Sequence, residues 1–352
     1  NGIQIKAGLE RFRTSGFNAI RQDQRPGTNP DRDGSKRDVA QVQISQKKED
    51  LRWSLSMAET RLLSQYDSEF GPVNQADESK YKLRHTAFSS EYDLSKDTQF
   101  QLGLGRYIDN LDAYLTSDPY AVFNSKDQLR LGINHRIAQQ HTLTAGYEKT
   151  WQAIASPTTA YTQTSRTGQA IRAGYQFNGE QHVVQLNVRQ DDYQGFAAAN
   201  TYYAGYQYFV LPNLRLLVSQ STGFSVPTFN DLYYPAKTYA PDPVYGYPGC
   251  FMCYGGNVNL KPDTSRSNEA GFQWGDERQT LRVVAFRNKY SNLIADNPDN
   301  PFNRINIGAA SNLGQEITYK KMIQDGAVRL TWVHQNPKDD ASNTALLKRA
   351  AH

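Results

Sequence analysis

The segment Gln128-Leu129-Arg130-Leu131-Gly132-Ile133-Asn134 alternates apolar side chains with polar or small ones, and this pattern decides the fold. Successive side chains of a β-strand point to opposite faces, so the segment predicts a strand with one apolar and one polar face. The same alternation recurs in Phe100–Gly105, Val184–Arg189 and Val328–His334. No long stretch shows the 3.6-residue period and capping residues of a helix.

The connections between these segments alternate in length. Short connections are expected near residues 47–50, 95–97, 138–140, 178–180, 211–213, 276–278 and 324–326. Long connections are expected near residues 21–37, 64–80, 108–125, 152–165, 191–200, 223–263, 291–302 and 335–345. Such alternation is typical of an outer-membrane β-barrel, whose periplasmic turns are short and whose outer loops are long. We therefore expect about sixteen strands of roughly nine to twelve residues, a length that crosses a bilayer when tilted.

The composition agrees with an all-β transmembrane antiparallel barrel. The chain of 352 residues has 22 Tyr, 15 Phe and 4 Trp but only 3 Met, and aromatic residues favour strands and membrane interfaces. Its net charge of +4, from 39 basic and 35 acidic residues, gives no reason to expect a nucleic-acid partner. A tandem of soluble β domains is the alternative, but it should show an internal repeat or a second apolar layer, and the sequence shows neither.

Both ends of the chain read as interrupted structure. Asn1–Ile5 already has the pattern of a strand, and Lys348–His352 has no closing element. A barrel must close in lipid, because an open edge leaves backbone N–H and C=O groups unpaired. We expect residues 1–352 to be the central part of a larger barrel.

Two acidic loops suggest a metal site. Asp31 and Asp33 precede Gly34 in the first long loop, and Asp67 and Asp77 lie in the second. Carboxylates at i and i+2 can turn toward one hard cation, and glycine permits the tight turn. Neighbouring loops lie side by side, so these four carboxylates could hold calcium. The alternative is an ordinary acidic loop surface.

The longest loop, residues 223–263, is rich in aromatic residues, among them Tyr233 and Tyr234. Loops of this length are usually functional or disordered, so we expect a ligand or partner surface, with self-packing of the loop as the alternative.

Cys250 and Cys253 predict a local disulfide in an oxidising compartment. No nucleophile, zinc-protease or phosphate-binding motif predicts an enzyme.

The same loop carries a resemblance to a known family. Thr222-Gly223-Phe224-Ser225-Val226-Pro227-Thr228-Phe229-Asn230-Asp231-Leu232-Tyr233 and Gly256-Asn257-Val258-Asn259-Leu260-Lys261-Pro262 resemble the paired signature of TonB-dependent outer-membrane receptors. Four further segments are similar to the vitamin B12 receptor subfamily: Val188–Asp192, Phe286–Ile294, Asn306–Ala310 and Leu346–Ala350.

The resemblance implies a barrel of 22 strands around a plug, so that this chain would lack the plug and several terminal strands. It implies a calcium-ligand role for Asp31, Asp33, Asp67 and Asp77. One further family ligand is an Asp, and Asn18 stands there instead. Tyr66 matches a residue that contacts substrate. The implied partners are cobalamin, outer-membrane lipids and, through the plug, the TonB complex.

Three alternatives to cobalamin uptake remain open at this point. A receptor for a ferric siderophore or haem would have the same architecture but no need of calcium. A passive porin would need neither plug nor TonB. A surface adhesin would use the long aromatic loop for docking.

Overall fold

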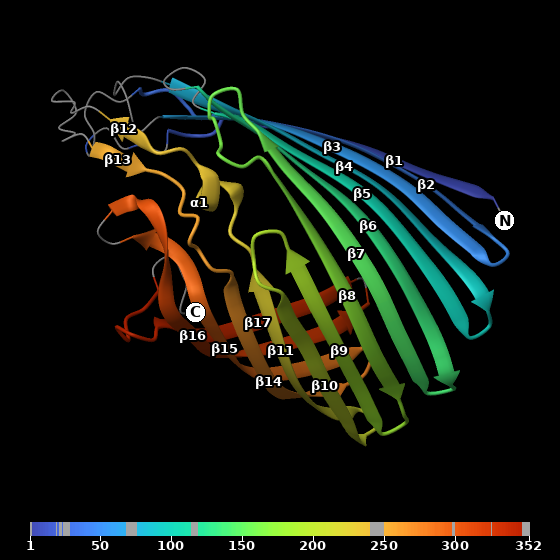
Figure 1. Ribbon diagram of the computed structural model, residues 1–352. Coiled ribbons are helices and arrows are strands. Elements are labelled where there is room, and N and C mark those ends of the chain that lie inside the picture. The colour runs from blue at the N-terminus through green and yellow to red at the C-terminus, as the bar shows by residue number, and fades with distance from the viewer. Residues whose placement is uncertain are drawn as a thin grey trace. The chain divides into compact units, whose positions relative to one another are not determined.

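A computed structural model describes residues 2–18, 20, 23, 29–67, 76–113, 119–239, 250–297, 300–324 and 326–346 (Figure 1). Fifteen strands form one sheet in which each strand is hydrogen-bonded to the next in chain order, except that β14 follows β11. The strands of this sheet are β1 (Ile3–Thr14), β2 (Ser35–Lys48), β3 (Leu51–Asp67), β4 (Ala76–Ser95), β5 (Thr98–Ala113), β6 (Tyr120–Ala138), β7 (His141–Ala155), β8 (Ser165–Asn178), β9 (His182–Tyr193), β10 (Ala199–Leu211), β11 (Leu214–Ser225), β14 (Asp263–Gly275), β15 (Gln279–Asn297), β16 (Asn300–Ile323) and β17 (Gly326–Asp339).

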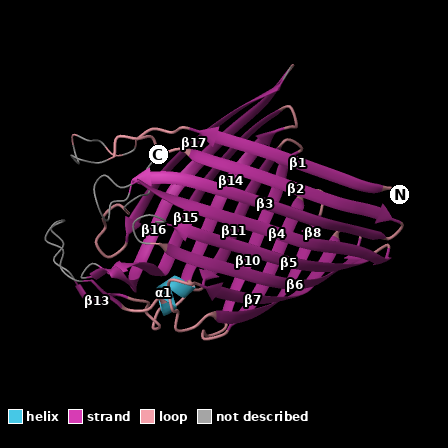
Figure 2. Cartoon of the chain, turned by 90° about the horizontal axis from the view of Figure 1, so that it is seen from above, coloured by secondary structure: helices cyan, strands magenta, loops and turns pink. Residues whose placement is uncertain are grey.

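The remaining elements lie between β11 and β14. They are the helix α1 (Phe229–Tyr233) and a two-stranded sheet of β12 (Lys237–Tyr239) and β13 (Cys250–Tyr254). Within the described ranges α1 is the one helix, as Figure 2 shows. No helix in this part of the chain is both long enough and apolar enough to cross a membrane.

The predicted fold class is confirmed. The pairs from β1–β2 to β4–β5 and from β9–β10 to β16–β17 are antiparallel, and the seven short connections fall where the sequence predicts them. Most strands are longer than predicted: β1, β9 and β11 have 12 residues, within the predicted range, whereas the others of the large sheet have up to 24, in β16. Pairing continues beyond a membrane-spanning length, so the connection expected at residues 291–302 shrinks until Asn297 pairs with Asn300.

The chain divides into two compact units. The first holds residues 1–132, 148–169 and 229–256, and the second holds residues 133–147, 170–228 and 257–352. In the second unit, exposed apolar side chains mark one face of the sheet, including Leu186 at 45%, Val218 at 51% and Leu330 at 62%. The alternate positions, such as Gln185, Gln207 and Gln273, form a polar face. We call these the apolar face and the polar face.

The turn between β14 and β15 gives a first prediction. Gly275 has φ +113°, and a Cβ added to it would lie 2.0 Å from the Gln279 carbonyl oxygen. We expect Gly275→Ala to lower the free energy of unfolding by about 1–3 kcal/mol, because an L side chain strains this backbone. Urea unfolding in lipid vesicles measures the change. Gly308→Ala is the control, since its Cβ would meet nothing within 4 Å, and equal losses in both variants would contradict the assignment.

Asp276 in the same turn gives a pH prediction. The backbone N–H groups of Gln279 and Arg278 donate to its Oδ1 at 2.9 and 2.8 Å, and these bonds lower the pKa of the carboxyl group. A lowered folded-state pKa stabilises the fold above the ordinary Asp pKa, and this contribution disappears as the pH falls through the folded value. Asp276→Ala should therefore be more destabilising at neutral pH than in acid. An unfolding difference between Asp276→Ala and the wild type that is independent of pH would refute this.

Candidate metal site and aromatic cluster

Three of the predicted metal ligands meet in the first unit. Carboxylate oxygens of Asp31, Asp33 and Asp67 all lie within 4.8 Å of one another. Asp31 and Asp33 lie in the loop before β2, whereas Asp67 is the last residue of β3. Residues more than thirty positions apart in sequence are thus brought to one point by the pairing of β2 with β3.

Gly34 holds the first loop against β3. Its N–H donates to Gln65 Oε1 at 3.2 Å, and the N–H of Gln65 donates to the Gly34 carbonyl oxygen at 2.9 Å. A Cβ on Gly34 would lie 2.9 Å from Gln65 Oε1 and 3.1 Å from the Thr14 carbonyl oxygen. The glycine after the two aspartates therefore permits a close backbone approach, which sets Asp31 and Asp33 beside Asp67.

Gly16 supports the loop from the other side. It has φ +61°, in the left-handed region, and a Cβ there would lie 1.8 Å from the Asp33 carbonyl oxygen. The N–H of Asp33 donates to the Phe17 carbonyl oxygen at 3.4 Å. The Asp33 backbone is thus held on the segment that follows β1.

The other predicted ligands lie outside this group of three. Asp77 is only 2% exposed and is paired in register with Tyr66, whereas Asp67 is paired with Ala76. Because neighbouring strand positions face opposite ways, Asp77 shares the face of Tyr66 and does not join the three carboxylates within 4.8 Å. Asn18 donates from Nδ2 to the Asn29 carbonyl oxygen at 2.7 Å and accepts at Oδ1 from the Ile20 N–H at 2.8 Å.

The three clustered carboxylates repel one another. Two like charges 4 Å apart interact by about 1 kcal/mol in water and about 4 kcal/mol near a protein surface. Both oxygens of Asp67 are buried from solvent, which raises the cost of that repulsion. The donor set consists of hard oxygen atoms, which suits Ca²⁺ and does not suit a soft metal.

Tyr66 lies beside this group. Its hydroxyl oxygen accepts a hydrogen bond from Ser79 Oγ at 3.2 Å, and Ser79 is 6% exposed. The residue predicted to contact substrate is therefore held by β4 next to the buried Asp77.

Tyr233 and Tyr234 belong to an aromatic cluster of the first unit. They pack against a core of Val122, Ile154, Tyr161 and Phe229. Tyr234 meets Tyr161 edge to face at 5.9 Å between ring centroids, and Tyr233 lies 6.1 Å from Phe229. Both tyrosines therefore help to pack α1 and the residue after it against β6, β7 and the connection that follows β7.

Polar contacts hold this cluster together, and no pattern in the sequence predicts them. The Tyr161 hydroxyl donates to Asn230 Oδ1 and lies 3.1 Å from the Tyr120 hydroxyl. Arg166, 5% exposed, stacks 5.1 Å above the Phe229 ring and donates to Gln152 Oε1 at 2.8 and 3.0 Å. Gly256 of the paired signature permits close packing, because its Cβ would lie 2.4 Å from the Leu232 backbone.

The second unit holds a smaller polar pocket near the loop end of β9 and β11. Arg189 pairs with Asp191 at 2.7 Å, and Asp191 is 4% exposed. Tyr193 and Phe224 meet at 6.2 Å beside them. The segment Val188–Asp192, quoted for its resemblance, thus supplies an ion pair whose carboxylate is buried and whose guanidinium is partly exposed.

The predicted disulfide falls outside the described side chains. The backbone of Cys250 and Cys253 belongs to β13, but neither side chain lies in the part that the structure describes. Most of the segment Leu346–Ala350 also lies outside the described residues.

Antiparallel strands with one apolar face, short turns at one end and longer connections at the other define an outer-membrane β-barrel. The chain belongs to the TonB dependent receptor-like, beta-barrel family, whose model matches residues 3–347. Its place is therefore the outer membrane.

Two curated relatives are named "Vitamin B12 transporter BtuB". That of Vibrio vulnificus is 28% identical over 240 residues, covering 65% of this chain and 36% of the relative. That of Photobacterium profundum is 22% identical over 262 residues, covering 72% and 40%. The chain thus spans less than half the length of either relative.

Solved structures share the fold. A mutant of the ferric enterobactin receptor PfeA of Pseudomonas aeruginosa superposes with a TM-score of 0.77 at 14% identity, covering 98% of this chain and 59% of that one. The siderophore receptor PirA of Acinetobacter baumannii superposes with a TM-score of 0.75 at 13% identity, covering 98% and 59%.

The aromatic cluster gives a prediction about α1. Phe229 is 8% exposed, so Phe229→Ala should leave a cavity and remove the partner of Arg166, at a cost of about 3–5 kcal/mol. We expect the amides of α1 to exchange hydrogen much faster in this variant, as measured by mass spectrometry. Phe17→Ala, at a position 75% exposed, is the control. Unchanged α1 exchange in Phe229→Ala would mean that the cluster does not hold the helix.

Proposed function

We propose that this chain is the barrel wall of a receptor that takes up cobalamin or a related corrinoid across the outer membrane, with energy supplied through TonB. The two curated relatives named as vitamin B12 transporters support the ligand class. The function is transport of an unaltered ligand, so no residue is assigned a catalytic role.

The observation that carries the proposal is the meeting of Asp31, Asp33 and Asp67. These are three of the positions to which the resemblance to vitamin B12 receptors gives a calcium-binding role. A bound Ca²⁺ would offset the repulsion of the carboxylates and join the loop before β2 to the end of β3. Tyr66, adjacent to Asp67, would then be held where a ligand above the loops could contact it.

Asp77 and Asn18 are not ligands of the three-carboxylate site in this proposal. Asp77 lies on the face of Tyr66, so it would serve a second ion or orient Tyr66 and Ser79. Asn18 provides a neutral oxygen whose lone pairs already accept the Ile20 N–H. The three clustered carboxylates are therefore the minimal calcium site.

A second candidate is a receptor for a ferric siderophore. The superposed structures are named as siderophore and ferric enterobactin receptors, but at 13–14% identity they support the fold alone. The two candidates differ in their dependence on calcium.

The test is equilibrium binding of cyanocobalamin to the full-length receptor in detergent, with Ca²⁺ and with a chelator. We expect the chelator to weaken binding by about tenfold or more, which is about 1.4 kcal/mol. The combined substitution Asp31→Asn, Asp33→Asn and Asp67→Asn should weaken it equally and abolish the effect of the chelator.

A matched control removes three carboxylates from short turns, in Asp50→Asn, Asp97→Asn and Glu180→Gln. It should bind as the wild type does. Binding that ignores calcium would discard the metal site and keep the ligand. No cobalamin binding, together with binding of ferric enterobactin, would replace the first candidate with the second.

A further inference from the structure

Three cations gather on the apolar face of the second unit. Arg266 of β14 is paired in register with Lys289 of β15, and Asn268 is paired with Arg287 one step nearer the short turn. All three cationic residues are exposed. We call Arg266, Arg287 and Lys289 the cation patch.

The strand register shows that the patch shares a face with the apolar residues. Arg266, Ala270 and Trp274 are separated by even numbers of positions along β14. The same is true of Lys289, Arg287 and Ala285 along β15. Trp274, 42% exposed, is paired with Leu281 next to the short turn. Every second residue of a strand lies on the same face, so the patch lies on the side that meets lipid.

The patch lies at the outer boundary of the apolar band. Eight positions separate Trp274 from Arg266, which is about 26 Å along a strand at roughly 3.3 Å per residue. At a tilt of about 35–45° this corresponds to about 20 Å along the membrane normal, close to the band height of about 25 Å. The long side chains of Arg266 and Lys289 span the remaining few ångströms to the lipid headgroups on the loop side, and Arg287 lies two positions deeper.

The patch has no acidic counterpart in the described part of the chain. No carboxylate among the described residues pairs with Arg266, Arg287 or Lys289, and Glu269 belongs to the polar face. Like charges directly opposed across two strands destabilise a sheet. An external anion would remove this repulsion.

In the first unit, by contrast, exposed cations of the strands are paired with carboxylates. Its exposed Arg11 pairs with Asp38 at 2.7 Å, and Arg84 pairs with Glu59. Those cations are neutralised within the sheet, so the unpaired patch is a local feature and not a general property of the strands.

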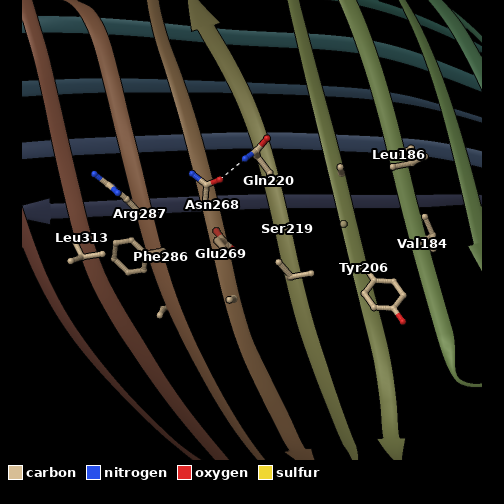
Figure 3. Close-up of a pocket in the computed structure, with 15 residues that line it drawn as sticks. Val184, Leu186, Tyr206, Ser219, Gln220, Asn268, Glu269, Phe286, Arg287 and Leu313 are labelled. Atoms are coloured by element: carbon tan, nitrogen blue, oxygen red, sulfur yellow. Dashed lines mark hydrogen bonds between the residues drawn. The ribbon is translucent and has the colours of Figure 1, made fainter.

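An apolar hollow lies directly below the patch. It has a volume of about 600 Å³, and the small residues Ala270 and Ala285, which are paired in register, lie between the larger Tyr206, Val218 and Leu313. Figure 3 shows Gln220, Asn268 and Arg287 in a row above it, with Gln220 Nε2 donating to Asn268 Oδ1 at 2.5 Å. Polar groups and cations thus border one edge of a hydrocarbon-lined depression.

We propose that this surface binds an anionic lipid of the outer leaflet. The phosphate-bearing headgroup contacts Arg266, Arg287 and Lys289, and one acyl chain occupies the hollow beside Ala270 and Ala285. Guanidinium groups suit phosphate because they offer paired N–H donors in one plane. A soluble phosphate compound would leave the hollow unfilled, so a lipid is the occupant that satisfies both parts.

The test uses the full-length receptor in neutral detergent, titrated with diphosphorylated lipid A and followed by native mass spectrometry. The combined substitution Arg266→Gln, Arg287→Gln and Lys289→Gln should weaken binding by about tenfold or more. Ala285→Phe should also weaken it, with no change in charge, by filling the hollow. Phosphatidylcholine should bind no better to the wild type than to the triple variant.

A matched control removes three cations near the short turns of the same sheet, in Arg278→Gln of the turn between β14 and β15 and in Lys320→Gln and Lys321→Gln of β16. It should bind lipid A as the wild type does. Equal affinity of the wild type and the patch variant would overturn the proposal, as would an equal loss in the control. A far-UV circular dichroism spectrum and a thermal unfolding midpoint equal to those of the wild type would confirm that the patch variant is folded.

Discussion

Backbone pairing is the constraint on which the rest of this structure depends. Within a bilayer no water satisfies an exposed N–H or C=O group, so each strand must be hydrogen-bonded to its neighbours along its length. Pairing in a fixed register then determines which side chains share a face and which lie opposite one another. The clustering of carboxylates at the loop end of β3 and the pairing of Arg266 with Lys289 are both consequences of that register.

The sequence predicts the part of the structure that this constraint makes periodic. Alternation at Gln128–Asn134 and its equivalents predicts the strands, and the short turns are predicted to within a few residues. The residues at which strands end in the long connections are not predicted. Strand pairing outside the membrane does not require alternating polar and apolar side chains, so the sequence carries no pattern for it. This is why β15 and β16 extend to Asn297 and Asn300 through a segment expected to be loop.

Some contacts of the candidate site can likewise be predicted from the sequence, and others cannot. The proximity of Asp31 and Asp33 to Asp67 follows from adjacent loops and could be anticipated. The position of Asp77 depends on a one-residue difference in register, which places it with Tyr66 and not with Asp67. The contact between Arg166 and Phe229 joins residues far apart in sequence, and a single chain carries no signal for such a pair. Tyr233 and Tyr234 show how an aromatic loop can serve packing before it serves a ligand.

The junction of β11 and β14 has a consequence for how such a protein can change over generations. Their register is continuous from Leu214–Trp274 to Ser225–Asp263, although Val226–Pro262 intervenes. The two strand ends are already side by side, so doubling the inserted length adds only about 0.6 kcal/mol of closure entropy. Closure entropy thus sets little limit on the length of that segment, although the part around α1 must keep its contacts with the aromatic cluster. Changes in the length of the outer segment can therefore accumulate over generations while the pairing of the two strands stays constant.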